Sequence, residues 1–176
     1  MFVLKVTTPD AYSTAHHAHP SLSSSPTHHQ FSHLYLTSST DWTVKLWSLR
    51  DKQRRPVHIF DYFDDYVYDV QWSPIHPALF VSADGTGQLN FWNLNADIEV
   101  PYASVDVGDG RTALNKARWN TQGNAIAVGD AAGMVHIYDV GERLAHPRSD
   151  EASRLRESLN DIETARAEAE RAGQLS

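Results

Sequence analysis

Three short stretches of this chain repeat one design at nearly constant spacing. Each follows a turn, continues with alternating apolar residues and closes on an aromatic ring; they cover residues 41–47, 87–92 and 133–138. The closing aromatics are 45 and 46 residues apart: Trp47, Trp92 and Tyr138. A period of about 40–45 residues with strands ending in an aromatic is typical of four-stranded propeller blades. The spacing therefore predicts an all-β fold, a partial β-propeller of about three blades.

Composition narrows the classes of protein that fit the chain. With 41% hydrophobic residues and five tryptophans in 176 residues, it can bury a core, so general disorder is excluded. A net charge of −7 argues against a nucleic-acid partner, because phosphate binding requires clustered lysines and arginines. No cysteine is present, and no apolar run is long enough for a signal peptide or a membrane span. We therefore expect a cytoplasmic protein that does not contact a membrane.

The chain divides into three regions by composition. Residues 1–30 are rich in serine and histidine, and we expect poor order there, with a degenerate strand at residues 21–25. Residues 31–143 carry the blades. Within them, residues 78–83 are almost entirely apolar, which predicts a strand buried on both faces. Residues 144–176 are expected to form a linker and an amphipathic helix.

The predicted C-terminal helix has a narrow apolar stripe. Its apolar residues are three or four positions apart, as on one face of a helix: Leu155, Leu159, Ile162, Ala165 and Ala169. Two pairs of opposite charge also stand four positions apart, Asp150 with Arg154 and Arg166 with Glu170. A stripe this thin favours docking on another surface over a long coiled coil.

An acidic residue precedes each closing strand. A buried carboxylate is costly unless donors surround it, and a tryptophan indole supplies one donor. The members of such a network expected in the first blade are Asp41, Trp47, Ser39 and either His16 or His17. Asp84 and Asp130 lie eight residues before their aromatics instead of six, so we expect an incomplete network there. We interpret all three acids and the closing aromatics as structural.

The sequence contains no recognisable catalytic constellation. Residues 108–110 lack the Lys-Ser/Thr of a phosphate loop, and no Gly-x-Ser-x-Gly elbow is present. Several histidines cluster near the N-terminus: His16, His17, His19, His28, His29 and His33. A zinc site needs three or four ligands on ordered backbone, so we interpret these clusters as polar linker, with a His-dependent metalloenzyme as the alternative. We expect no cofactor and no enzyme activity.

Some aromatics occupy positions where a blade needs no large apolar residue. Trp42 directly follows the turn residue Asp41, and Tyr62, Phe63 and Tyr66 cluster before the next strand. Aromatics on loops at one face of a fold are candidate interface anchors. For Tyr66 a packing role fits equally well.

The blades resemble those of a known family. Residues 31–47 (FSHLYLTSSTDWTVKLW), 65–101 (DYVYDVQWSPIHPALFVSADGTGQLNFWNLNADIEVP) and 113–141 (ALNKARWNTQGNAIAVGDAAGMVHIYDVG) look like the last WD-repeat blades of the cytoplasmic dynein intermediate chain. The second segment is the most specific, because generic blades do not share its loops. The resemblance implies a non-catalytic scaffold subunit whose propeller binds the dynein heavy chain and supports microtubule-based transport. Trp42, Asp65 and Tyr66 are candidate partner contacts because they fall on predicted loop edges.

Two departures from the family shape further expectations. The N-terminal arm and the earlier blades of the family have no counterpart in this sequence, so we expect no light-chain or dynactin binding and suspect a truncated start. Propellers need about four to eight blades to close, so three blades are expected to leave unpaired sheet faces and a poorly stable fold. A generic WD-repeat adaptor, for example in a ubiquitin ligase, is the alternative function.

Overall fold

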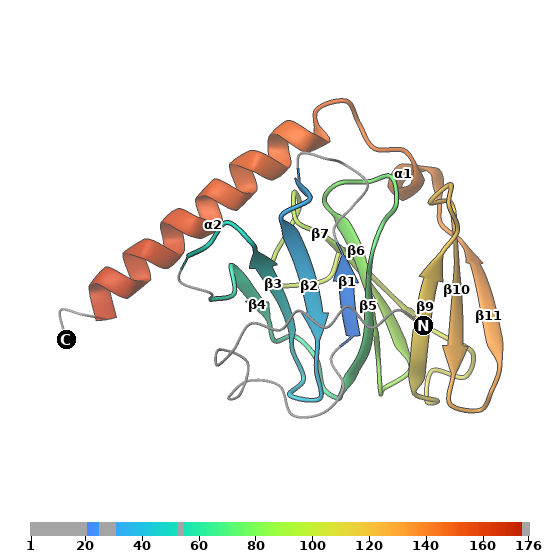
Figure 1. Cartoon of the computed structure of the whole chain (residues 1–176). Helices are drawn as coiled ribbons and strands as arrows, with labels where there is room; N and C mark the ends of the chain where they lie inside the picture. The colour runs from blue at the N-terminus through green and yellow to red at the C-terminus, as the bar shows by residue number, and fades with distance from the viewer. Residues whose placement is uncertain (1–20, 25–30, 53–54, 174–176) are drawn as a thin grey trace.

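The computed structural model describes residues 21–24, 31–52 and 55–173 and consists mostly of antiparallel sheet. Three sheets stand side by side, with a long C-terminal helix across one end (Figure 1). The described strands form two four-stranded sheets and one three-stranded sheet, in chain order along the sequence. This arrangement is consistent with a partial WD-like propeller, as the repeat spacing predicted.

The first blade is built from neighbouring strands joined by hairpins. Its strands are β1 (Ser21–Ser24), β2 (Leu34–Ser38), β3 (Val44–Ser48) and β4 (His58–Phe60). The degenerate strand expected near residues 21–25 is therefore present as β1, which pairs with β2. A strand with one apolar residue joins the sheet because its backbone groups complete the hydrogen-bond ladder, whatever its side chains.

The second blade has the same order. Its strands are β5 (Val67–Trp72), β6 (Leu79–Asp84), β7 (Gln88–Asn93) and β8 (Ala103–Asp106). Every residue of β6 is buried, which confirms the strand buried on both faces. Alternate residues of β6 enter different clusters: Phe80 packs toward the first blade and Val81 toward the third.

The third blade has three described strands: β9 (Leu114–Trp119), β10 (Ala125–Asp130) and β11 (Val135–Asp139). Its inner face packs on the second blade through Ile126 and Val128, which are fully buried. On β11 the alternate residues Val135 and Ile137 are 67% and 76% exposed. The outer face of this sheet thus exposes apolar side chains of β11 to solvent beside the charged Arg118 and Asp139, and no further blade covers it among the described residues.

The closing aromatics occupy equivalent places in the three blades. Each lies directly across the hairpin from the residue twelve positions earlier: Trp47 opposite Tyr35, Trp92 opposite Phe80 and Tyr138 opposite Ile126. The shared register is the structural counterpart of the spacing in the sequence.

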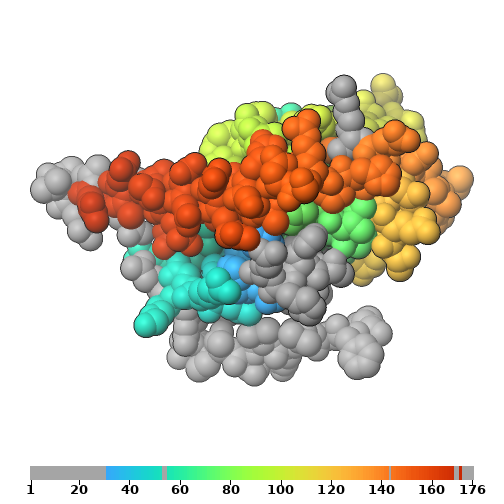
Figure 2. Space-filling view, turned by 90° about the horizontal axis from the view of Figure 1, so that it is seen from above, coloured from blue at the N-terminus to red at the C-terminus, as the bar shows by residue number. Residues whose placement is uncertain are grey.

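The C-terminal region contains a short helix α1 (Glu142–Ala145) and a long helix α2 (Glu151–Gly173). Seen from above, α2 lies across the molecule on one side of the blades (Figure 2). Leu155, Leu159 and Ile162 are buried in the cluster between the first two blades, so the helix docks on this chain's own sheets. Ala165 is exposed, and the side chain of Ala169 lies outside the described residues. No helix in the described part of the chain is long and apolar enough to cross a membrane.

Candidate functional site: the turn rim

The antiparallel registers bring several turns to one end of the sheets. The β2–β3, β6–β7 and β10–β11 turns lie at this end, together with the β4–β5 and β8–β9 loops, because paired strands reverse direction (Figure 1). We call this end the turn rim. The opposite end, where α2 lies, is the helix rim.

In the first blade Asp41 organises the β2–β3 turn. Its Oδ1 accepts bonds from the Thr43 backbone N–H at 3.2 Å and the Thr43 hydroxyl at 2.6 Å, and its Oδ2 lies 2.7 Å from Lys45 Nζ. Ser39 Oγ accepts the Asp41 backbone N–H. Partial burial opposes ionisation, but the bonds from Lys45 and Thr43 outweigh it, so the pKa of Asp41 lies below its usual value.

In the second blade Asp84 is buried and accepts four bonds. Oδ1 accepts the backbone N–H groups of Thr86 and Gln88 and the Thr86 hydroxyl, and Oδ2 accepts the Asn90 amide at 2.9 Å. Asn90 in turn accepts the Ser104 hydroxyl of β8. Asp84 thus has more donors than Asp41, although none of the four bonds comes from the Trp92 indole or from a histidine.

The third blade resembles the second, but His136 replaces the amide of Asn90 and Ala132 stands where the second blade has Thr86. Asp130 Oδ1 accepts the Met134 backbone N–H, and Oδ2 lies 2.8 Å from His136 Nε2. His136 stands six residues after the acid, the same offset as Asn90 from Asp84. Hydrogen bonds from His136 and Met134 lower the pKa of Asp130. The acids thus hold the turns of the three blades.

The tryptophan indoles bond to hydroxyls instead of the turn acids. Trp47 Nε1 donates to Thr37 Oγ1 at 2.9 Å, and Trp92 Nε1 donates to Ser82 Oγ at 3.0 Å. The predicted bond from Trp47 to Asp41 was therefore wrong, because the indole reaches across to the neighbouring strand β2. His16 and His17, the other predicted members, lie outside the described residues.

Trp42 occupies a position that glycine holds in the other two blades. The residue five positions before the closing aromatic has positive φ in each turn: 66° at Trp42, 94° at Gly87 and 83° at Gly133. A bulky residue in this left-handed conformation is strained by about 1–2 kcal/mol. Trp42 is also 48% exposed, so about half of its side chain is open to solvent.

The β4–β5 loop lies beside the β2–β3 turn. The Val67 backbone N–H donates to the Ser39 carbonyl at 3.1 Å and joins the two segments. Tyr66 is 44% exposed and Asp65 half-buried, with one carboxylate oxygen accepting the Tyr66 backbone N–H. Phe63 is buried, so the prediction of an exposed aromatic was wrong at this position; its ring packs 5.7 Å from that of Trp92.

Sequence reasoning missed Asp69, which joins the second and third blades. This residue of β5 is fully buried. Its Oδ2 accepts the Ala117 backbone N–H at 3.0 Å, and its Oδ1 lies 3.1 Å from Lys116 Nζ, both on β9. The signal was available, because an acidic residue inside an alternating apolar strand requires partners.

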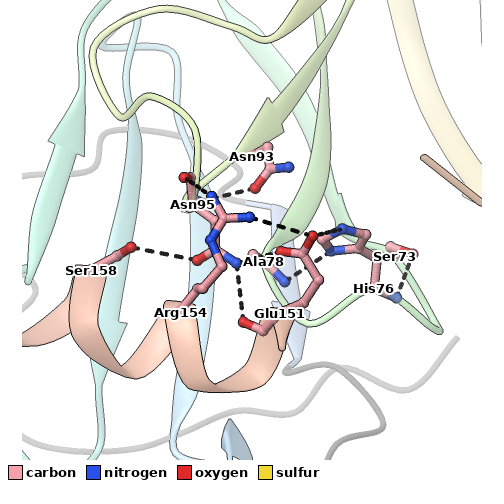
Figure 3. A network of polar contacts seen from close by, with 8 residues as sticks. All are labelled: Ser73, His76, Ala78, Asn93, Asn95, Glu151, Arg154 and Ser158. Carbon is pink, nitrogen blue, oxygen red and sulfur yellow. Dashed lines mark hydrogen bonds and ion pairs between the residues drawn. The ribbon is translucent and has the colours of Figure 1, made fainter. Parts of the chain in front are cut away.

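At the helix rim a polar network attaches α2 to the second blade (Figure 3). Glu151 Oε2 accepts the Asn95 amide at 2.6 Å, and Arg154 donates to the Asn95 carbonyl at 3.0 Å. His76 is buried beside Glu151, with Nε2 3.9 Å from Oε1, and its Nδ1 accepts the Ala78 backbone N–H. Arg154 thus contacts Asn95 and Glu151 instead of the predicted Asp150.

A second contact ties α2 to the first blade. Arg166 lies 3.0 Å from Asp51 Oδ2 and donates to the Pro56 carbonyl at 3.2 Å. The predicted partner Glu170 has a side chain outside the described residues. The charges of this helix therefore orient it on the sheets.

No metal-binding cluster of three or more His, Asp or Glu side chains exists among the described residues. Of the histidines considered as ligands, only His33 lies in the described part of the chain. Asp41, Asp84 and Asp130 bond within their own turns, which is an arrangement suited to shaping a surface.

Comparison with known proteins identifies a relative. No protein-family profile matches the chain. Over 132 residues, which are 75% of this chain, it is 52% identical to a protein of Drosophila melanogaster named cytoplasmic dynein 1 intermediate chain. The matched region spans 20% of the length of that protein. Identity at this level, together with the stacked blades, supports the conclusion that the chain is a dynein intermediate chain fragment.

Proposed function

We propose that this chain is a non-catalytic scaffold of the cytoplasmic dynein complex, which binds the dynein heavy chain and supports microtubule-based transport. The observation that carries the proposal is the 52% identity to the fly intermediate chain over 132 residues, which are 75% of this chain. The same homology supports a proposed cytoplasmic, microtubule-associated location.

The geometry favours a scaffold over an enzyme. Asp41, Asp84 and Asp130 each accept bonds from their own turn, and Asp69 joins two blades. Function must be argued from a site. The most prominent exposed apolar side chains lie on the outer face of the third sheet and among the aromatics of the turn rim. Both places are suited to contacts with other proteins.

Affinity purification tests the proposal. The tagged full chain, expressed in cells that contain cytoplasmic dynein, should recover the dynein heavy chain at mild salt, as identified by mass spectrometry. A Leu36→Asp variant is the matched control, since a charge at this fully buried position should unfold the first blade and abolish recovery. Recovery of ubiquitin-ligase subunits without heavy chain would favour the adaptor function instead.

A further inference from the structure

Five residues of the turn rim form one surface on the first two blades. Trp42 comes from the β2–β3 turn, and the others come from the β4–β5 loop: Asp61, Asp64, Asp65 and Tyr66. We call this set the Trp42 surface. Trp42 and Tyr66 are 48% and 44% exposed, and Asp61 and Asp64 are exposed on the loop that the Val67–Ser39 bond joins to the Trp42 turn.

The ring of Trp42 is not required by the fold. The corresponding turns of the second and third blades close with glycine at the same positive φ, so glycine meets the backbone requirement without strain. About half of the Trp42 side chain is exposed, so a large part of its ring is available for contacts outside this chain. A large exposed ring held in a strained conformation points to a contact outside the chain.

The surface is held rigidly in place before any partner arrives. Phe63 is buried at the centre of the β4–β5 loop, and the Tyr66 carbonyl accepts the Gly85 backbone N–H at 2.8 Å. Asp65 lies against Gly85 so closely that a side chain there would collide with its carboxylate. A preorganised surface loses little conformational entropy on binding, which favours affinity.

The charge of the surface selects its partner. The turn and the loop, residues 39–43 and 61–66, contain four acidic residues and no basic one. Asp41 is paired with Lys45, whereas no ion pair involves Asp61, Asp64 or Asp65 within the described residues. A segment that carries arginines would suit both the unpaired carboxylates and the exposed Trp42 ring, because guanidinium groups pair with carboxylates and stack on indole rings.

We propose that the Trp42 surface binds an arginine-rich segment of a partner protein, with Trp42 as the anchor and Asp61 and Asp64 as the charge partners. The inference rests on the proposed scaffold function, and it specifies the chemistry that the partner must present. An acidic segment would be repelled by the carboxylates of Asp61 and Asp64.

Fluorescence anisotropy with the full chain and a labelled helical probe peptide tests the proposal. The probe, about 20 residues long, carries arginines on one face, and a matched peptide carries glutamates in their place. The arginine peptide should bind with an affinity that falls as salt rises, and the glutamate peptide should not bind. Equal binding of the two peptides, or no binding of either, would overturn the proposal.

Variants locate the binding. Trp42→Gly restores the residue that the other blades use, so it should fold and yet bind the arginine peptide roughly tenfold more weakly. Asp61→Asn with Asp64→Asn should weaken binding and flatten its salt dependence. Tyr102→Ala, at a comparably exposed ring before β8 near the helix rim, is the control and should bind as the parent does. If Trp42→Gly binds the arginine peptide as tightly as the parent does, Trp42 is not the anchor and the proposal fails.

The same variants separate this proposal from the scaffold function. If Trp42→Gly loses the arginine peptide but still recovers the heavy chain, the Trp42 surface serves another partner and the scaffold function stands. If the parent binds the peptide yet recovers no heavy chain, the scaffold proposal fails while the surface proposal holds.

Discussion

The two rims of the blades differ in how their side chains are used. At the helix rim, Leu155 is fully buried, and Glu151 and Arg154 bond to the Asn95 loop. At the turn rim, the carboxylates of Asp41 and Asp84 bond inside their own turns, and the rings of Trp42 and Tyr66 remain exposed. The helix rim is therefore covered in part by α2 of this chain, although Leu49 and Tyr102 remain exposed there, whereas no described helix covers Trp42 and Tyr66 at the turn rim.

The largest effect is expected from the apolar anchor of α2. Leu155→Ala should lower the free energy of unfolding by about 3 kcal/mol, because it leaves a cavity in the cluster shared with the first two blades. Urea denaturation measures the change. Ala167→Ser, on the exposed face of α2, is the control and should change stability by less than about 0.5 kcal/mol. Equal stability of Leu155→Ala and the parent would show that the helix is not docked.

A smaller loss of stability is expected when the polar contacts that attach the same helix are removed. Glu151→Ala removes the acceptor of the Asn95 amide and the carboxylate beside Arg154, and should lower stability by about 2 kcal/mol. Glu157→Ala on the exposed side of α2 provides the comparison and should be nearly neutral. If both variants melt alike, the network does not hold the helix.

At the turn rim the expected effect has the opposite sign. Trp42→Gly relieves strain of about 1–2 kcal/mol but adds freedom to the unfolded chain worth about 0.4–1 kcal/mol. The net result should be a gain in stability of about 0.5 kcal/mol, measured by denaturation side by side with the parent. A clear loss would mean that the ring packs on this chain and would remove the contrast between the rims.

The smallest expected effect is on the stability of the fold at acidic pH. The pKa of Asp41 lies below its usual value of 3.8, so its contribution to stability is complete above about pH 4 and is lost as pH falls through the lowered pKa. Asp41→Asn should therefore flatten the decline of stability below pH 4, as followed by urea midpoints. A decline as steep as that of the parent would argue that the Lys45 and Thr43 bonds contribute little.

The repeated elements were predictable because their signals are local. The spacing of Trp47, Trp92 and Tyr138 predicted the blades, and the stripe on residues 155–162 predicted a docked helix. Both depend on periodicity along the chain, which follows directly from strand and helix geometry.

The contacts between elements were not predictable in the same way. The acceptor of the Trp47 indole depends on hairpin register, and Asp69 meets Ala117 across 48 residues of sequence. Arg166 reaches Asp51 on the first blade, which no helical spacing could reveal. The exposure of Trp42 matched its predicted position, but the strain of its backbone appears only when the three turns are compared.

Strand β6 has a consequence for the motions of the molecule. It lies between two apolar clusters, and its neighbours β5 and β7 cover both of its edges. Separation of either outer blade would still leave one of its faces shielded from water. The amide protons of Leu79–Asp84 should consequently exchange with deuterium last of all, and exchange of β11 should be among the fastest.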